Sequence, residues 1–346
     1  VLIGMEPTGH YWRKIAFFAM EKNYEVRFIR TTALKHQREL DESSSAKNDV
    51  RDAYTIANIV REGKYIDTVI EDGAFRQLRT LAHTRERVQR ISTGAKHALK
   101  GVLEDYFPEL KSIFWSMKAK GLLALLAQCP FPEDVLAITP DMVTEIIAHS
   151  TRRKAKAREK ALMIYEAAQQ SVGLKRIGQA DRHRVATYLS EIRHSEGQLK
   201  EIELQMKTLL QKIPCAEYIL SIPGIGVLTC GVFLGELGDP YNFKDPKQIV
   251  KYAGYDPKEH DSGQSIGRKI ISKKGRWLLR KYLYFIAIRV VHRSPFFKEY
   301  YENKQKTMTK KEALCAVVIK LIKVIFALLR DKRTFTEKQR CLKQAA

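Results

Sequence analysis

The spacing of apolar residues near the start of the chain predicts a small α/β unit. A short apolar run at 1–5 is followed by the turn signal Pro7-Thr8-Gly9, and residues 24–29 alternate polar with apolar or β-branched residues. Both runs have the length and composition of strands, whereas residues 10–22 between them have apolar positions at helical spacing. The order strand, helix, strand predicts two parallel strands in one sheet.

Beyond residue 75 the apolar positions recur every three or four residues, which predicts a mostly helical structure. We expect helices at about 75–106, 176–212, 227–237, 274–292 and 310–330. The apolar residues of 176–212 keep a spacing typical of a helical hairpin or a coiled coil. Three prolines, at 130, 132 and 140, limit the intervening segment to short helices.

These patterns predict α/β structure followed by mostly α structure, in three regions. Residues 1–72 form the α/β domain, 73–214 a long helical linker, and 215–346 a helical C-terminal domain. A chain of 346 residues exceeds the size of a typical single domain. Because the sequence begins without Met and inside an apolar run, we expect it to be a fragment of a longer protein.

The charge of the chain is strongly positive. It has 61 Lys and Arg against 39 Asp and Glu, a formal net charge of +22. With 45% hydrophobic residues the chain has enough apolar material for real cores, so this is not the composition of a disordered basic tail. A folded protein with this charge attracts polyanions, of which DNA and RNA are the usual ones. Charge alone does not separate an enzyme from a ribosomal or chromatin-type binder.

Cysteine usage and hydropathy indicate a cytoplasmic protein. The five cysteines form no C-x-x-C pair, which argues against a zinc site and against a disulfide framework. The most apolar segment, 313–329, is interrupted by Lys320 and Lys323, so we expect no membrane-spanning helix. We therefore expect a bacterial or archaeal cytoplasm, with the protein associated with the nucleoid.

Three carboxylates near the start form a candidate metal site. Glu6 comes at the end of the first predicted strand, where open α/β sheets place their sites. Asp49 and Asp52 lie three residues apart in a segment that opens a helix to about residue 62, so both project from one face. Carboxylate oxygens are the ligands that Mg²⁺ prefers, and Mg²⁺ serves phosphodiester chemistry. The plainer alternative is that the two aspartates only cap the helix.

A second candidate site follows residue 258. A polar, glycine-containing loop holds Ser262, and after it comes a cluster of cations without any acid: Arg268, Lys269, Lys273, Lys274, Arg276 and Arg280. Such cations bind phosphate, and a serine beside them could attack a phosphodiester. A polar loop before a basic helix, without catalytic function, is the alternative.

The N-terminal motifs resemble a known family. The segment Gly4–Trp12, followed about forty residues later by Lys47–Ala53, resembles the N-terminal domain of IS110-family transposases. That domain is similar to RuvC resolvase, with an RNase H-type fold and a D-E-D-D metal set. By position, Glu6 matches the family's Glu, and Asp49 and Asp52 match its closing pair. The first Asp of the set has no counterpart after Val1.

The C-terminal motifs resemble the same family. Ile222–Gly226, together with Ser262-Gly263 ahead of Ile271–Arg280, is similar to the family's C-terminal transposase domain, whose S-G motif carries a nucleophilic serine. The matching residue is Ser262, whereas Ser265 and Ser272 are weaker candidates. The Pro-Gly-Ile-Gly element is also similar to the hairpin of helix-hairpin-helix DNA binders, and a plain tight turn is the alternative.

The resemblance implies a DNA transposase or site-specific recombinase that uses Mg²⁺ and a serine nucleophile. It further implies a homodimer or homotetramer, with the helical middle as the dimerising element, and a guide RNA that bridges donor and target DNA. Two alternatives stay open. One is a RuvC-like nuclease that cuts with a metal-activated water and no serine. The other is a non-catalytic nucleic-acid-binding remnant.

Overall fold

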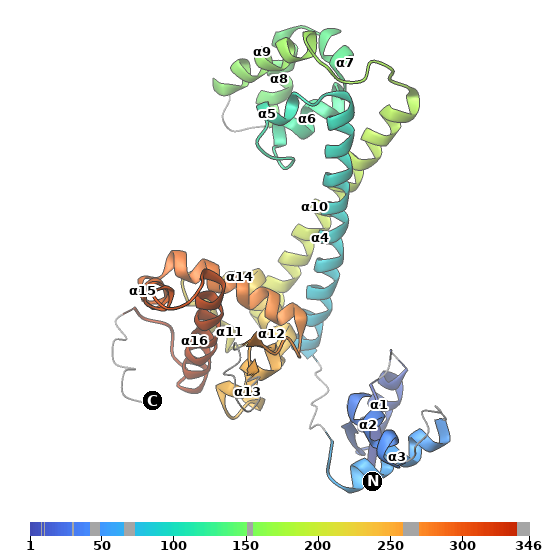
Figure 1. Ribbon diagram of the computed structural model, residues 1–346, viewed down its shortest axis with the longest axis vertical. Helices are drawn as coiled ribbons and strands as arrows, with labels where there is room; N and C mark the ends of the chain where they lie inside the picture. Colours follow the sequence, from blue (N-terminus) through green and yellow to red (C-terminus); the bar gives the residue numbers. More distant parts are fainter. Residues whose placement is uncertain are drawn as a thin grey trace, which may run out of the picture. The chain divides into compact units, whose positions relative to one another are not determined.

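The chain divides into two compact units, Val1–Glu71 and Asp72–Ala346 (Figure 1). The computed structural model describes residues 1–7, 9, 11–29, 31–41, 49–65, 73–150, 155–258 and 270–337. Within these residues no helix combines the length and the apolar character needed to cross a membrane.

The N-terminal unit is built on two parallel strands. Strand β1 (Leu2–Met5) pairs with β2 (Glu25–Phe28), from Leu2 opposite Glu25 to Met5 opposite Phe28. Helix α1 (Trp12–Glu21) connects them, which confirms the predicted strand, helix, strand order. Two helices follow, α2 (Thr31–Asp41) and α3 (Asp49–Arg61). The sequence pattern predicted α3 but not α2.

Alternation along β1 determines what packs on each face of the sheet. Ile3 and Met5 join a core with α1, in which Ala16 is fully buried. Gly4 points the other way, toward α3, and a Cβ added to it would lie 2.4 Å from Cγ2 of Val60. The absence of a side chain at Gly4 therefore lets α3 lie directly on the strand.

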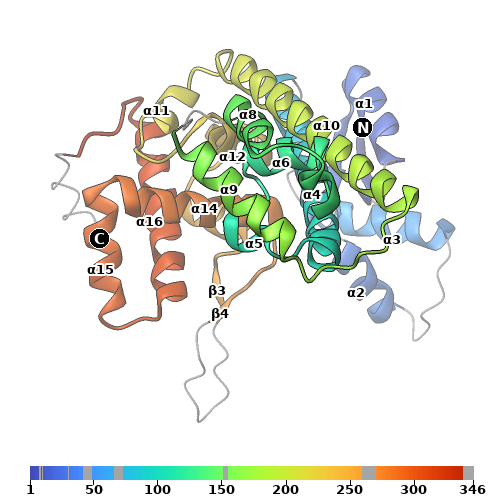
Figure 2. The same cartoon turned by 90° about the horizontal axis from the view of Figure 1, so that it is seen from above.

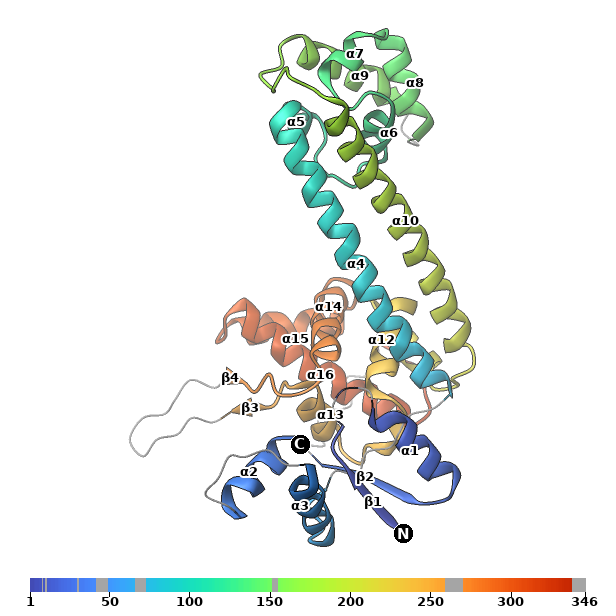
Figure 3. The ribbon, with the colours of Figure 1, turned by 90° about the vertical axis from the view of Figure 1, so that its right-hand side faces the viewer.

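The second unit contains two long helices packed side by side, α4 (Gly73–Tyr106) and α10 (Gln179–Leu210) (Figures 1 and 3). They are antiparallel, since Arg85 forms a 3.0 Å ion pair with Glu203 and Lys96 a 2.8 Å ion pair with Glu196. The helical hairpin predicted from the spacing of apolar residues is thus formed within one chain.

At one end of this helical pair a group of short helices surrounds its own core. Leu99 and Phe107 of the α4 end, Leu125, and Ile192 of α10 are fully buried in this core. The sequence predicted a short helical region around the three prolines, but it did not predict α9 (Ala155–Gln169). The helices are α5 (Leu110–Ile113), α6 (Lys120–Gln128), α7 (Pro132–Leu136), α8 (Pro140–Ser150) and α9 (Ala155–Gln169).

At the other end the C-terminal helices enclose a larger core. Its buried residues include Leu78 of α4 and Met206 of α10. They are joined by the apolar residues of α12 (Val227–Leu237), α14 (Trp277–Arg293) and α16 (Lys310–Arg330). Figure 2 shows α14, α15 and α16 side by side. The elements are α11 (Ala216–Leu220), α12 (Val227–Leu237), η1 (Pro240–Asn242), α13 (Pro246–Ala253), β3 (Pro257–Lys258), β4 (Ile270–Ile271), α14 (Trp277–Arg293), α15 (Pro295–Gln305) and α16 (Lys310–Arg330).

Helix α12 approaches α4 unusually closely. A Cβ added to Gly235 would lie 2.6 Å from the backbone nitrogen of Arg79, so the glycine allows the two helix backbones to touch. The predicted helices at 227–237, 274–292 and 310–330 are confirmed as α12, α14 and α16.

Candidate metal and nucleic-acid sites

Glu6 lies directly after the last residue of β1 and is half-buried. The N–H of Ile29 donates a 3.1 Å hydrogen bond to the carbonyl of Met5, so the two strands stay paired up to this edge. Parallel strands place their carboxyl ends together, and ligands of open α/β sheets bind there. Glu6 thus has the position that the strand pattern predicted.

Asp52 lies on the sheet-facing side of α3. It is 9% exposed, and its Oδ1 atom is shielded from solvent. Ile56 and Val60 follow it at four-residue spacing on the same helix face, and both contact the position of Gly4. The α3 face that carries Asp52 is therefore the one that packs on β1.

Asp49 is the first residue of α3, and its side chain lies outside the described residues. Among the side chains that the structure describes, no group of three or more His, Cys, Asp or Glu is close enough to hold one metal ion. Glu6, which is half-buried, and Asp52, whose Oδ1 is shielded, remain as carboxylate donors, and such oxygen donors fit a hard cation such as Mg²⁺ better than a soft one.

The predicted nucleophile Ser262 lies outside the described residues, as do Arg268 and Lys269. The structure does describe both ends of their segment. Strands β3 and β4 are antiparallel, with Pro257 opposite Ile271 and Lys258 opposite Ile270. The ladder therefore holds Lys258 and Ile270, the described residues that flank segment 259–269, opposite each other.

The predicted cations that the structure does describe fall into two kinds. Lys273 and Lys274 are exposed in the turn before α14. Arg280 is engaged by the backbone, because its Nη1 donates to the carbonyls of Lys273 (2.9 Å) and Ala253 (3.3 Å). The Arg280 guanidinium thus fixes the turn that contains Lys273 and Lys274. That Arg280 also contacts nucleic acid stays a prediction.

Arg276 is half-buried and faces the protein core. Its guanidinium lies 5.0 Å from the ring centroid of Tyr252, and Nη1 is 3.9 Å from Oε2 of Glu236. A cation held over an aromatic face and near a buried carboxylate is well fixed in place. Of the predicted cations that the structure describes, Lys273 and Lys274 are therefore the two that are exposed to a ligand.

Glu236 is a residue that the sequence analysis missed. It is 2% exposed, and Oε1 lies 2.8 Å from Nε2 of His83 and 3.6 Å from Nε of Arg79, both on α4. A buried carboxylate requires such partners. The available signal was that Glu236 is the single acid of the otherwise apolar segment 227–237.

The Pro-Gly-Ile-Gly element forms the connection between α11 and α12. Gly224 has φ +100°, and a Cβ on it would lie 2.9 Å from the carbonyl carbon of Arg289 in α14. The N–H of Gly226 donates to Oγ1 of Thr229 at 3.0 Å, which caps α12. Gly224 is thus required for close packing of this turn against α14.

Comparison with known proteins gives two family matches. A model described as the transposase IS116/IS110/IS902 family matches residues 216–302, and a model of DEDD transposases of the IS110 type matches residues 1–108. The first region contains the serine segment and its cations. The second contains the three carboxylates.

Curated relatives are similar to most or to part of the chain. An uncharacterised 43.6 kDa protein of insertion element IS110 from Streptomyces coelicolor is 25% identical over 293 residues, 83% of this chain and 71% of that protein. The pilin gene-inverting protein of Moraxella lacunata is 30% identical over 193 residues, 54% of each chain. The transposase for insertion sequence element IS1328 of Yersinia enterocolitica is 26% identical over 144 residues, 40% of this chain and 43% of that protein. The chain thus spans about half the length of the pilin gene-inverting relative.

Proposed function

Because the chain belongs to the IS116/IS110/IS902 family of transposases, we propose that it cuts and rejoins DNA strands as a transposase or site-specific recombinase. The observation that carries the proposal is the pairing of two family regions in one chain. Glu6, Asp49 and Asp52 fall in the first region, and Ser262 falls in the second.

Ser262 acts as the nucleophile in this proposal. Its Oγ attacks the scissile phosphorus and loses its proton to solvent, while the bond from phosphorus to the leaving sugar oxygen breaks and that oxygen takes up a proton. A sugar hydroxyl of another strand then attacks the phosphoserine, which restores the serine and seals the new strand. Lys273 and Lys274, exposed near the end of this segment, neutralise the phosphate charge.

Glu6, Asp49 and Asp52 hold a divalent cation, Mg²⁺ by preference, in an RNase H-type (RuvC-like) domain. The parallel β1–α1–β2 arrangement, with Glu6 at the strand end and Asp52 on the helix that covers β1, supports this proposal. When bound, Mg²⁺ supplies Lewis-acid stabilisation of phosphate oxygens. The carboxylates themselves position it and balance its charge.

The partners proposed are DNA, a bridging guide RNA and further copies of the chain in a homodimer or homotetramer. The net charge of +22 is compatible with two nucleic-acid partners. The place of action proposed is the nucleoid of a bacterial or archaeal cell.

A covalent-adduct assay tests the serine mechanism. The chain is incubated with Mg²⁺, labelled DNA carrying the ends of the encoding element, and RNA transcribed from the element's non-coding flank. We expect a protein–DNA adduct on denaturing gels with the wild type and with the control S265A, none with S262A, and none when EDTA removes the metal. The control removes a hydroxyl from the same segment.

Two outcomes would overturn this proposal. Strand cleavage by S262A that is lost in E6Q would favour a nuclease that uses a metal-activated water. Salt-dependent binding without any cleavage by the wild type would favour a non-catalytic nucleic-acid-binding protein.

A further inference from the structure

One face of α4 carries a row of basic side chains that the proposed chemistry does not use. The row, here called the α4 stripe, consists of Arg76, Arg79, His83, Arg87 and Arg90. Spacings of three and four residues place all five on one side of a helix. Four of them are exposed and Arg79 is half-exposed, whereas the opposite face is buried against α10 and α12.

The acids beside the α4 stripe are buried and paired. Glu86, the single acid in 73–103, is 6% exposed, pairs with Lys281 of α14 and lies 3.9 Å from Arg90. Glu236 is 2% exposed and faces Arg79 and His83. Both carboxylates lie on the buried side of the stripe. The groups that the stripe exposes to solvent are therefore its basic side chains.

An aromatic side chain lies between two members of the α4 stripe. Trp277, the first residue of α14, is 42% exposed. The Arg90 guanidinium carbon lies 5.5 Å from its ring centroid, and the His83 ring meets it edge-on at 6.4 Å. A partly exposed indole beside basic side chains is what proteins use to stack a nucleic-acid base beside its phosphates.

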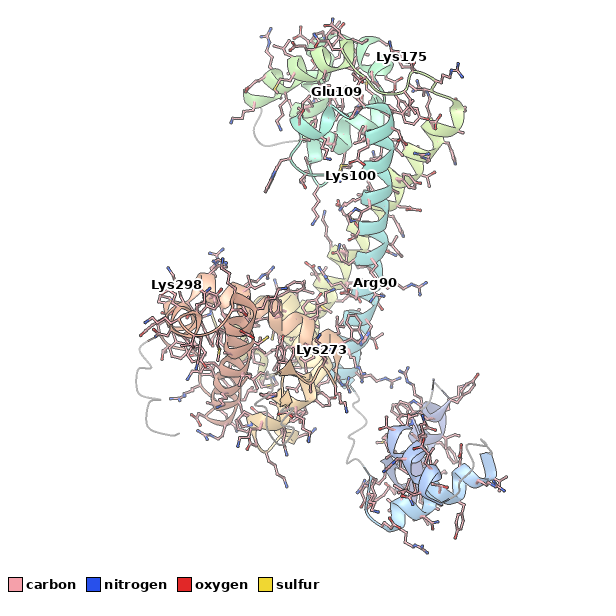
Figure 4. All side chains as sticks on the ribbon, in the orientation of Figure 1. Arg90, Lys100, Glu109, Lys175, Lys273 and Lys298 are labelled. Carbon is pink, nitrogen blue, oxygen red and sulfur yellow. The ribbon has the colours of Figure 1, made fainter. Side chains whose placement is uncertain are left out.

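We propose that the α4 stripe and Trp277 together bind a nucleic-acid strand, with the cations on its phosphates and Trp277 against an unpaired base. The stripe runs from residue 76 to 90, which at the helical rise is about 21 Å. That length matches roughly six nucleotides of a strand stacked as in a duplex, at about 3.4 Å each. Arg276 directly precedes Trp277 in the chain, and the exposed Lys273 and Lys274 lie in the turn before it, so basic side chains continue from the α4 stripe into this turn. Figure 4 labels Arg90 of α4 and Lys273 of the turn, both in the second unit.

This inference deepens the proposed function by placing one of its nucleic-acid contacts, and binding assays test it without any cleavage step. The test variant R87Q/R90Q removes two charges from the α4 stripe. The matched control K200Q/K207Q removes two exposed charges from α10, the other helix of the pair. Each is titrated by fluorescence anisotropy against labelled 30-nucleotide single-stranded DNA, duplex DNA and RNA of one sequence.

We expect R87Q/R90Q to weaken single-strand binding by about tenfold or more at 0.15 M salt, and to reduce the slope of log K against log salt by about 1.4. The control should change affinity by less than about twofold. The two single-stranded probes decide between DNA and RNA as the source of the bound strand. Equal weakening by both double variants would overturn the proposal, because net charge alone would then explain binding.

Trp277 is tested directly by its fluorescence. The chain has three tryptophans, so W12F/W115F leaves Trp277 as the single indole. Addition of the single strand should quench this emission, and W277A should bind about fivefold or more weakly whereas W277F should bind nearly as well as the wild type. Binding without quenching, or equal affinities for W277A and the wild type, would overturn the role of Trp277 without touching the serine mechanism.

Discussion

Nε2 of His83 lies 2.8 Å from Oε1 of Glu236, a contact between residues 153 positions apart in the sequence. It joins the long helix α4 to a carboxylate that is 2% exposed on the apolar helix α12. Arg276, at the start of α14, approaches the other oxygen of the same carboxylate. Glu236 of α12 therefore links α4 and α14, the two helices that carry the proposed nucleic-acid surface.

Replacing Glu236 should destabilise the second unit. In E236A the partly exposed guanidinium groups of Arg79 and Arg276 lose their shared counter-charge, and His83 loses a hydrogen-bond partner. We expect this to cost about 2–3 kcal/mol, less than the loss of a fully buried pair, because both arginines are partly exposed. E236Q should lose less, since it keeps an acceptor. Urea unfolding measures both. The control E191A, at an exposed position on α10, should change stability by under about 0.5 kcal/mol, and an equal effect of E191A would contradict this role of Glu236.

The contact between β1 and α3 should tolerate no side chain at Gly4. In G4A the new Cβ meets Cγ2 of Val60, so we expect a loss of about 1–3 kcal/mol in the N-terminal unit and reduced cleavage, because Asp52 moves with α3. The second change V60A removes the obstructing atoms and should restore part of the loss in G4A/V60A. Hydrogen exchange of residues 1–65, compared with α16, reports the effect. Additive losses in the double variant would disprove the steric cause.

The buried thiol of Cys215 should resist alkylation in the folded protein. Burial raises the pKa of Cys215 to about 11 from its ordinary value near 9, because the thiolate is poorly solvated there. The folded state therefore keeps the proton to higher pH than the unfolded state. The stability that this thiol contributes is complete below pH 9 and is lost between about pH 9 and 11.

Site-resolved alkylation measures this protection. At pH 8 Cys215 should react far more slowly in the native protein than in urea, and the same holds for Cys230, whose pKa burial also raises. Native-state labelling at the denatured rate would refute the burial. In C215A the fall in stability between about pH 9 and 11 should become smaller.

The sequence by itself determined the elements whose residues follow a regular period. Residues 1–5 and 24–29 gave β1 and β2, and the helical spacing of 75–106 and 176–212 gave α4 and α10. Motif order also identified the family, since Glu6, Asp49, Asp52 and Ser262 are recognised by their neighbours along the chain. These features are local, and local pattern is sufficient for them.

The tertiary structure alone decided which side chains face one another. Helix α2 was not predicted, because its many polar residues leave no clear apolar period. Nothing near Glu236 in the sequence indicates that its partners are on α4, because a buried carboxylate is stabilised by groups brought close in space. Similarly, Arg280 resembles its exposed neighbours in sequence but donates to the backbone of Ala253 and Lys273. Contacts between residues far apart in the chain depend on how the helices pack. The packing of α14 beside α4 brings Trp277 next to Arg90 and His83, so that the α4 stripe and Trp277 form one surface.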